Sequence, residues 1–297
     1  MPELPEVETM RRSLLPSIGR RIVSVNQPES RYRPIAMEPG LKILQQKIIG
    51  RSIIDVERLG KRVVVCLDDQ SSLLFQPKMA GLVLMDSPPN ESHLRLVVSL
   101  SPIESSQNAR NAFSSSQVRD CSSIAQILYW DQRGLGTVQL WTAEQMKAFL
   151  ASGVLGPDAL AVDSDTFRSQ FRNTARPVKP TLLEQARVAG IGNLYASEIL
   201  HRSGVHPARR CDRLSKPAWK RIFDSTRLIL LEAIEHEGST LSDGTYRKSK
   251  ENPGGYQNSH RVYDRAGLPC LTCGNHLIVR IVQSQRSTFF CPRCQKR

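Results

Sequence analysis

The sequence predicts an α+β protein of several domains, in which an N-terminal helix and a β-sandwich precede a helical domain and a small cysteine-rich hairpin. Three observations support this fold class. The chain has 297 residues, a length that favours two or three domains over one. Its short β-type runs give way to helical spacing of apolar residues near residue 142. Four of its seven cysteines lie beyond residue 269.

The first predicted domain covers residues 1–142. Residues 1–15 are typical of a short helix, because their apolar side chains fall on one face, and Pro16 ends it. Short β-type runs separated by turn residues follow and indicate a β-sandwich. These runs are 22–25, 53–56, 63–67, 82–85, 94–100, 124–129 and 137–141. Residues 101–123 hold eight serines and few apolar residues, so we expect an exposed, mobile insertion there.

The second predicted domain covers residues 143–260 and is helical. Apolar residues recur at helical spacing, and Pro and Gly interrupt the pattern between the segments. The expected helices are 144–150, 165–172, 181–188, 194–203 and 217–236. Residues 239–259 are rich in Gly, Ser, Asn and Lys, which predicts a loop.

The third predicted domain, residues 261–297, contains two Cys-x2-Cys pairs separated by 17 residues. The pairs are Cys270 with Cys273 and Cys291 with Cys294. Four thiolates can enclose one Zn²⁺ in a tetrahedron, and no ligand position then remains open for catalysis. We therefore expect one structural zinc ion that staples a hairpin of the β-type runs 277–283 and 286–290. Free thiols and disulfides are the alternatives.

The net charge of the chain suggests a polyanionic partner. Lys and Arg number 41 against 28 Asp and Glu, which gives +13 and a pI near 9.7. Nucleic acid is the first candidate for such a basic protein. No apolar run reaches the roughly 18 residues of a membrane span, and no signal peptide opens the chain. These features, together with an odd cysteine count, favour a cytoplasmic protein without a disulfide framework.

The first residues carry the strongest chemical signal. Removal of Met1 would make Pro2 the N-terminal residue, and an α-amino group has a pKa of roughly 7.7–8.0. Such an amine can attack an aldehyde-like carbon and form a Schiff base, while Glu3 beside it can move protons. The alternative is an ordinary helix start, with proline in the first turn and acidic residues near the positive end of the dipole.

Four further basic or glycine-rich features each have two interpretations. Residues 190–196, Gly-Ile-Gly-Asn-Leu-Tyr-Ala, can bind an anion at a helix start or simply form a capped turn. Lys179, between two prolines, can contact phosphate or remain solvated. Lys61 follows Gly60 at the start of a β run and can reach into a cleft or lie on an exposed turn. Arg286, expected at the hairpin turn, can meet a phosphate or stay in solvent.

These motifs together resemble those of the bacterial formamidopyrimidine-DNA glycosylases. The matching segments are 2–9 (Pro-Glu-Leu-Pro-Glu-Val-Glu-Thr), Gly60-Lys61, Lys179-Pro180-x-Leu182-Leu183, 190–196, His206-Pro207 and the four terminal cysteines. They occur in the order of that family and extend over the whole chain. The resemblance implies an N-terminal helix with a β-sandwich, a helix-two-turn-helix domain and a zinc finger.

The resemblance also implies the activity and the site. The expected enzyme is a monomeric glycosylase and AP lyase that excises oxidised purines from double-stranded DNA in base excision repair, with β,δ-elimination after attack by Pro2. Glu3 and Lys61 complete the catalytic set. The residues implied to contact DNA are Met79, His93, Arg133, Leu135, Lys179, Asn193 and Arg286. Glu6 and Glu198 support the site, and a loop with Ser242, Thr245 and Tyr246 would cover the flipped base.

Two departures from the family pattern concern the side chains that fill the space of the flipped base. Met79 and Arg133 match by position, although Met79 taken alone is more typical of a buried core residue. Gln76 replaces a histidine, and Leu135 stands where phenylalanine is usual, so the preferred opposite base is open. Two other functions compete: a lesion-binding protein without chemistry, and an oxidised-pyrimidine enzyme resembling endonuclease VIII. Retention of Pro2, Glu3 and Lys61 argues against the first, and Leu4 with Met79 against the second.

Overall fold

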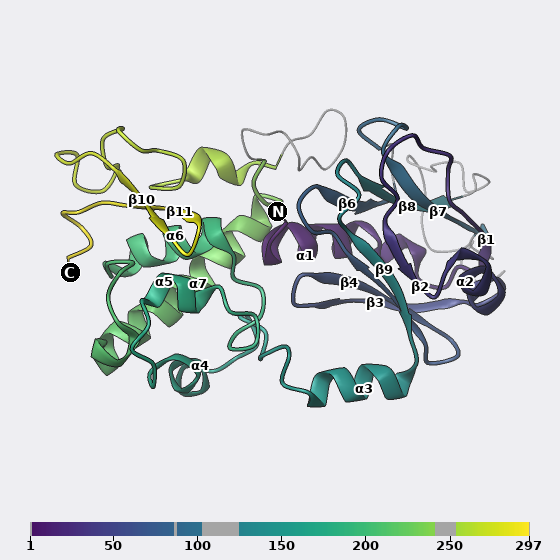
Figure 1. Cartoon of the computed structure of the whole chain (residues 1–297), viewed down its shortest axis with the longest axis horizontal. Helices are drawn as coiled ribbons and strands as arrows, with labels where there is room; N and C mark the ends of the chain where they lie inside the picture. Colours follow the sequence, from purple (N-terminus) through teal and green to yellow (C-terminus); the bar gives the residue numbers. More distant parts are fainter. Residues whose placement is uncertain (1, 86–87, 103–124, 241–253, 297) are drawn as a thin grey trace, which may run out of the picture. The chain divides into compact units, whose positions relative to one another are not determined.

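Two β-sheets dominate the first half of this computed structural model, which describes residues 2–85, 88–102, 125–240 and 254–296 (Figure 1). One sheet has the strand order β1-β7-β8-β6 and the other the order β2-β9-β5-β4-β3. The first consists of β1 (Ile22–Asn26), β6 (Gly81–Leu84), β7 (Leu94–Leu100) and β8 (Ala125–Asp131). The second consists of β2 (Ala36–Glu38), β3 (Ile53–Leu59), β4 (Arg62–Leu67), β5 (Ser72–Gln76) and β9 (Thr137–Trp141).

One hydrophobic core holds these sheets together. It contains buried residues of both sheets, of helix α1 (Leu4–Ser13) from Val7 onward, and of α2 (Leu41–Ile48). In α2 the buried residues Leu44 and Ile48 are four positions apart and share one face. A short 3-10 helix, Leu15–Ser17, follows α1. This N-terminal unit comprises residues 2 and 7–146.

A tight hairpin places Lys61. Strands β3 and β4 are antiparallel and pair as far as Leu59 with Arg62, so only Gly60 and Lys61 remain in the loop. Gly60 has a φ of 58°, a left-handed conformation that such two-residue loops require and that glycine adopts at little cost. Lys61 is therefore presented at the tip of a rigid hairpin.

Helices form the second unit, which comprises the described residues among 3–6, 147–243 and 254–297. They are α4 (Ser164–Phe171), α5 (Val178–Leu182), α6 (Asn193–Ser203) and α7 (Lys216–Glu235), and α3 (Ala143–Ala151) begins in the N-terminal unit. Asp163 caps α4, Ser215 caps α7, and Gly204 ends α6 with a φ of 69°. Helix α6 packs on α7, and the core around them includes Leu4. We call this the C-terminal unit.

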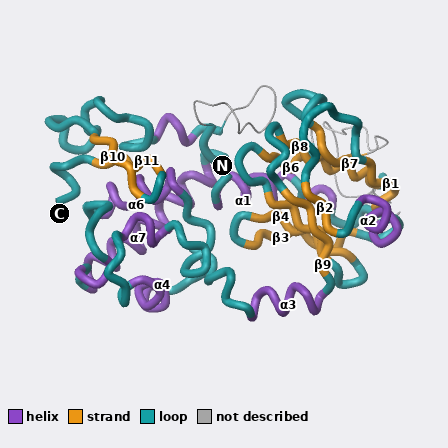
Figure 2. The backbone as a smooth tube through the Cα atoms, in the orientation of Figure 1, coloured by secondary structure: helices purple, strands orange, loops and turns teal. Residues whose placement is uncertain are grey.

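The last residues form a hairpin of β10 (Val279–Gln283) and β11 (Arg286–Phe290), drawn in orange beside α6 in Figure 2. The strand β11 contacts α6, and the two strands pair up to Gln283 and Arg286. A 3-10 helix, Tyr256–Ser259, precedes this region. No helix in the described ranges is both long enough and apolar enough to cross a membrane.

The predicted fold class is confirmed, with differences in four of its elements. The expected helix at 181–188 is wrong: α5 spans Val178–Leu182, and the chain then turns because the Gln185 side chain bonds the backbone at Leu183, Gly190 and Ile191. Helix α2 and strands β2 and β5 were not predicted. Most of the serine-rich insertion and of the 239–259 loop lies outside the described residues.

Candidate functional site

The Glu3 carboxylate is fixed at the N-terminus of α6. Its Oε1 accepts the backbone N–H of Leu194 at 3.0 Å, and its Oε2 accepts that of Tyr195 at 3.4 Å. These N–H groups have no partner within the helix, and the helix dipole favours a negative charge there. Gly192, which precedes α6, leaves no room for a side chain, since a Cβ would lie 2.1 Å from Glu3 Cδ. The N–H groups of α6 and the absence of a side chain at Gly192 thus hold the Glu3 carboxylate, which directly follows Pro2 in the chain.

A second buried carboxylate fixes the backbone around Glu3. Glu6 Oε2 accepts the Glu3 N–H at 2.8 Å, and Glu6 Oε1 accepts the Tyr195 hydroxyl at 2.6 Å and the Ser239 N–H at 2.9 Å. Burial, and next the charge of Glu3, raise the pKa of Glu6 above its usual value. Pro2 is itself buried and precedes this network directly. The network therefore limits how the first residues can move.

Glu198, on the same helix, holds the segment that enters the terminal domain. Its carboxylate accepts the backbone N–H groups of Arg261, Val262 and Tyr263 at 2.7–3.0 Å. Burial nevertheless raises the pKa of Glu198 above its usual value. Three N–H bonds to one carboxylate fix a backbone turn, so Glu198 has a structural role.

Lys179 lies inside the C-terminal unit, where it brings together two other predicted DNA-contacting positions. Its ammonium donates to Asn193 Oδ1 at 2.6 Å, to the Ser287 carbonyl at 3.0 Å and to Thr288 Oγ1 at 2.9 Å. An ammonium has three N–H donors, so all of them are engaged. Burial is the main cause that lowers the pKa of Lys179, to about 8. Arg286, next to Ser287, is exposed at the start of β11.

A rigid loop carries two of the predicted wedge residues in the N-terminal unit. The fully buried Asp131 accepts three backbone N–H groups at 2.7–3.0 Å, from Arg133, Gly134 and Gly136. Gly134 has a φ of 61°, and a Cβ there would lie 2.2 Å from the Arg33 carbonyl oxygen. These contacts hold the loop in a conformation that exposes Arg133 and leaves Leu135 half-buried.

Met79 and Leu135 line one hollow of about 650 Å³, together with Arg33, Lys78 and neighbouring residues. Met79 is 40% exposed, so it is not a core residue. His93 does not line this hollow, although its backbone carbonyl accepts the Asp131 N–H at 2.9 Å. Its ring packs on Tyr32 with 4.3 Å between centroids, and edge-on to Trp130. Burial, and next the charge of Arg95, lower the pKa of His93. The structure therefore groups Met79 with Leu135 and assigns His93 to an aromatic cluster.

The four terminal cysteines meet the geometric requirement of a metal site. Their sulfur atoms all lie within 4.8 Å of one another, with Cys270 3.9 Å from Cys294 and Cys273 3.7 Å from Cys291. A tetrahedron with metal–sulfur bonds of about 2.3 Å has edges of about 3.8 Å. A disulfide would need about 2.05 Å. The donor set fits a structural metal ion and excludes disulfides among these four.

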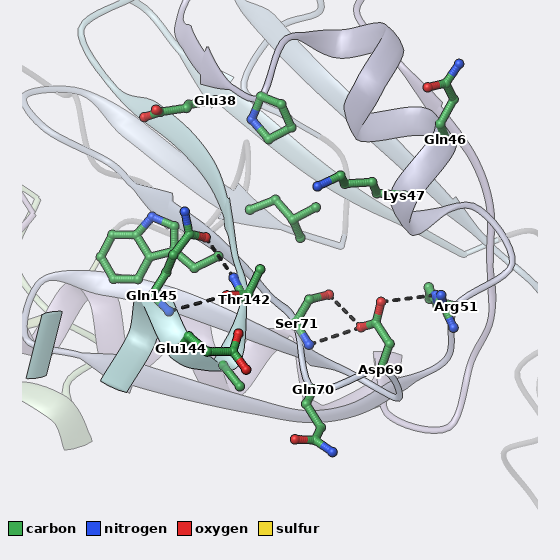
Figure 3. A pocket seen from close by; sticks show the side chains of 14 residues that line it. Glu38, Gln46, Lys47, Arg51, Asp69, Gln70, Ser71, Thr142, Glu144 and Gln145 are labelled. Atoms are coloured by element: carbon green, nitrogen blue, oxygen red, sulfur yellow. Dashed lines mark hydrogen bonds and ion pairs between the residues drawn. The ribbon is translucent and has the colours of Figure 1, made fainter. Parts of the chain in front are cut away.

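A larger cavity, of about 840 Å³, is lined by residues of α2, of β9 and of the start of α3 (Figure 3). Its wall includes Trp141, Lys47, Arg51 and Asp69, and the last two form an ion pair at 3.2 Å. None of the predicted site residues lines this cavity. This larger hollow is thus separate from the predicted site residues.

Several contributing residues were not singled out from the sequence. Tyr195 stands inside the quoted segment 190–196 and Asp131 comes two residues before Arg133, but only their contacts reveal a role. Ser239 and Thr288 carry no local signal, because their partners are more than 100 residues away. The predicted loop residues Ser242, Thr245 and Tyr246 lie outside the described residues.

Comparison with known proteins gives a consistent result along the chain. Residues 1–138 match the formamidopyrimidine-DNA glycosylase N-terminal domain, 155–245 the H2TH domain of the same enzymes, and 267–297 a zinc finger found in FPG and IleRS. A formamidopyrimidine-DNA glycosylase of Solibacter usitatus is 32% identical over 297 residues, with 100% of both chains covered.

Solved structures are similar over the same extent. Lactococcus lactis Fpg in complex with DNA that contains an abasic site superposes with a TM-score of 0.82 at 29% identity, with 100% of both chains covered. MutM in complex with carbocyclic 8-oxo-G containing DNA gives a TM-score of 0.80 at 30% identity, again with 100% coverage of both. The chain therefore belongs to the formamidopyrimidine-DNA glycosylase family of DNA-binding repair enzymes.

Proposed function

We propose that this protein is a bifunctional DNA glycosylase and AP lyase that excises 8-oxoguanine and formamidopyrimidines from duplex DNA, with Pro2 as nucleophile. The observation that carries the proposal is the Glu3 carboxylate, fixed by Leu194 and Tyr195 one residue from the Pro2 nitrogen. A lesion-binding protein has no need of a carboxylate held at this position. Relatives solved with abasic-site and 8-oxo-G DNA support the substrate class.

The reaction begins with the Pro2 amine in its neutral form. The Pro2 nitrogen forms a bond to sugar C1′, and the bond from C1′ to the damaged base breaks, its electron pair leaving with the base. The Pro2 nitrogen then gives up its N–H proton, and Glu3 supplies a proton to the sugar ring oxygen as the bond from that oxygen to C1′ breaks, which gives an iminium ion. Loss of a proton from the adjacent carbon then expels the 3′ phosphate, and a second elimination expels the 5′ phosphate. Water finally releases Pro2.

The remaining predicted residues would hold DNA in the extruded conformation. Met79 and Leu135 share one hollow and Arg133 lies in the same rigid loop as Leu135, so we assign these three to the space left by the flipped base. Lys61 would reach the reacting nucleotide from its hairpin tip. Leucine in place of an aromatic wedge cannot stack, and we expect a weaker preference for the opposite base.

We assign the phosphate contacts to Asn193 and Arg286 and give Lys179 a different role. All three Lys179 donors are used inside the protein, so this residue would orient Asn193 and the β10–β11 turn toward the backbone of DNA. His93, packed on Tyr32, remains a proposed contact of the N-terminal unit. The assignment of Ser242, Thr245 and Tyr246 to a loop over the base also remains a proposal.

This role of Lys179 predicts a pH dependence of DNA binding. The pKa of about 8 lies below the usual 10.5, so the ammonium loses its proton as pH rises through 8 and then has two N–H donors for three acceptors. We expect affinity for an uncleavable lesion duplex to fall between pH 7 and pH 9. Fluorescence anisotropy at constant ionic strength measures this.

The matched variants isolate the titrating group. Lys179→Met should bind more weakly at pH 7 and show a flatter pH profile, whereas Lys216→Met, at an exposed position of the same unit, should retain the wild-type profile. A Lys179→Met profile as steep as that of the wild type would refute the assignment.

We propose one structural Zn²⁺ in the four-cysteine site. Its removal should weaken binding of an uncleavable lesion duplex by roughly 10- to 100-fold, the value of one or two charged hydrogen bonds, because the hairpin would no longer present Arg286. Chelation or Cys270→Ser, with metal content verified by mass spectrometry, tests this. Cys66→Ser, in the N-terminal unit, is the control. Unchanged affinity after verified metal loss would contradict the role of the finger.

The test of the proposed function is borohydride trapping. Met1-processed protein is mixed with a duplex that contains one 8-oxoguanine opposite cytosine, and borohydride is added. We expect strand cleavage and a covalent adduct that mass spectrometry locates on Pro2. Tight binding without an adduct would instead establish a lesion binder. An adduct formed only with oxidised pyrimidines would show that these, and not oxidised purines, are the substrates.

We further propose the domain limits 1–142, 143–260 and 261–297, a monomeric state, and a cytoplasmic, nucleoid-associated location in a bacterium. The boundary of the first two follows the start of α3 at Ala143. Sedimentation of the protein with and without a lesion duplex would test the monomer.

A further inference from the structure

The sulfur of Cys270 has a neighbour from outside the terminal domain. Cys270 is 1% exposed, and the Nε2 atom of His201 lies 3.6 Å from its Sγ. His201 belongs to α6, two residues before the end of that helix. A nitrogen–sulfur separation of this size is within the range of an N–H···S hydrogen bond, since sulfur is larger than oxygen. An imidazole thus faces one of the four thiolates.

The other ring nitrogen of His201 shows which atom carries the hydrogen. His201 is 3% exposed, and its Nδ1 is buried without a hydrogen-bond partner among the described residues. A neutral imidazole has a single N–H, and an unpaired buried N–H is costly. The hydrogen therefore belongs on Nε2, which has an acceptor, while Nδ1 remains the unprotonated nitrogen. The Nε2–H group donates to the Cys270 sulfur.

We propose that His201 is an outer partner of the metal site, which donates its Nε2–H to the Cys270 thiolate and thereby increases retention of the metal ion. The inference rests on the structural metal proposed above. Four thiolates bring four negative charges to a divalent cation, and a hydrogen-bond donor stabilises the excess charge on sulfur. Outer partners of metal ligands typically contribute 10- to 100-fold to metal affinity.

A second contact separates this donor role from simple docking of the finger. Gln295 is 1% exposed; its Nε2 donates to the Val205 carbonyl at 3.0 Å, and its Oε1 accepts the Cys291 N–H at 2.9 Å. This bond ties the metal-binding turn to the residues just after α6 without the use of His201. Loss of the imidazole N–H should therefore change metal retention more than it changes attachment of the finger.

The test compares two substitutions of His201 in the full chain. His201→Phe keeps an aromatic ring but removes the donor, and His201→Gln places an amide N–H near the position of Nε2. We expect His201→Phe to release zinc to a colorimetric chelator 10- to 100-fold more readily than the wild type. His201→Gln should recover most of the difference. His276→Phe, at an exposed position within the finger, is the matched control and should behave as the wild type.

Each outcome has one meaning. Zinc release from His201→Phe at the wild-type rate would overturn the inference. So would equal release from His201→Phe and His201→Gln, because the effect would then come from packing; circular dichroism and thermal unfolding confirm that both variants are folded. A wild-type protein purified with no bound zinc would instead refute the metal proposal itself, independently of His201.

Discussion

A protein that retains Met1 is expected to form no covalent adduct with lesion DNA. Its lyase activity should fall by roughly 10⁴-fold or more, because loss of a catalytic nucleophile typically lowers the rate by at least this factor. Acylation turns the Pro2 amine into an amide, whose nitrogen has no basic lone pair. The measurement is borohydride trapping with matched preparations that differ by this single residue. Treatment with methionine aminopeptidase should restore trapping, which makes the blocked protein its own control.

Substitution of the nucleophile gives an independent check. Pro2→Gly keeps an N-terminal amine but replaces the rigid secondary amine with a flexible primary one, so we expect trapping to be severely impaired. Binding of an uncleavable duplex should remain close to that of the wild type. Undiminished trapping in the Met1-retaining protein would falsify the assignment of Pro2.

The second large effect is expected at a residue with no side chain. In Gly192→Ala, the new Cβ would lie 2.1 Å from Glu3 Cδ and 2.4 Å from both carboxylate oxygens, so the Glu3 side chain must leave the α6 N-terminus. Displacement of a reacting group by about 1 Å costs roughly 10²-fold in rate. We expect at least this loss in single-turnover excision.

The matched control is Gly40→Ala. Gly40 has a φ of −59°, and nothing lies within 4 Å of a Cβ there, so the same chemical change should leave excision unaltered. DNA binding and the thermal midpoint of Gly192→Ala would show whether the loss concerns the reaction rather than folding. Equal excision by the two variants would remove Glu3 from the reaction.

The sequence was sufficient for the parts of the fold in which local pattern and tertiary environment agree. Strands β7 and β9 begin and end at the predicted residues, and α7 differs by one residue at each end. Strand β5 was missed because its central residues are buried on both faces, which removes the alternation that marks a strand. The signal for α2 was present in Leu44 and Ile48, but the β-type runs around it dominated the interpretation.

The candidate site could be predicted only as far as motifs allow. The resemblance identified Glu3, Lys179 and Asn193 as residues, but their arrangement depends on contacts across the chain. Lys179 reaches Thr288, 109 positions away, and Glu3 reaches Leu194, 191 positions away. No local pattern reports such pairs. Lys179 as a phosphate contact stays a prediction, and the sequence did not indicate that its ammonium is enclosed by protein acceptors.

Almost every residue of helix α6 is expected to be sensitive to substitution. Nine of its eleven residues are buried, Asn193 is half-buried, and Arg202 alone is exposed. Its first turn holds Glu3, its middle holds the 261–263 backbone through Glu198, and its last turn faces Cys270 through His201. Efforts to stabilise the enzyme should therefore leave this helix untouched and work on α7, where Leu228 and Leu231 are exposed and we expect polar replacements to be tolerated.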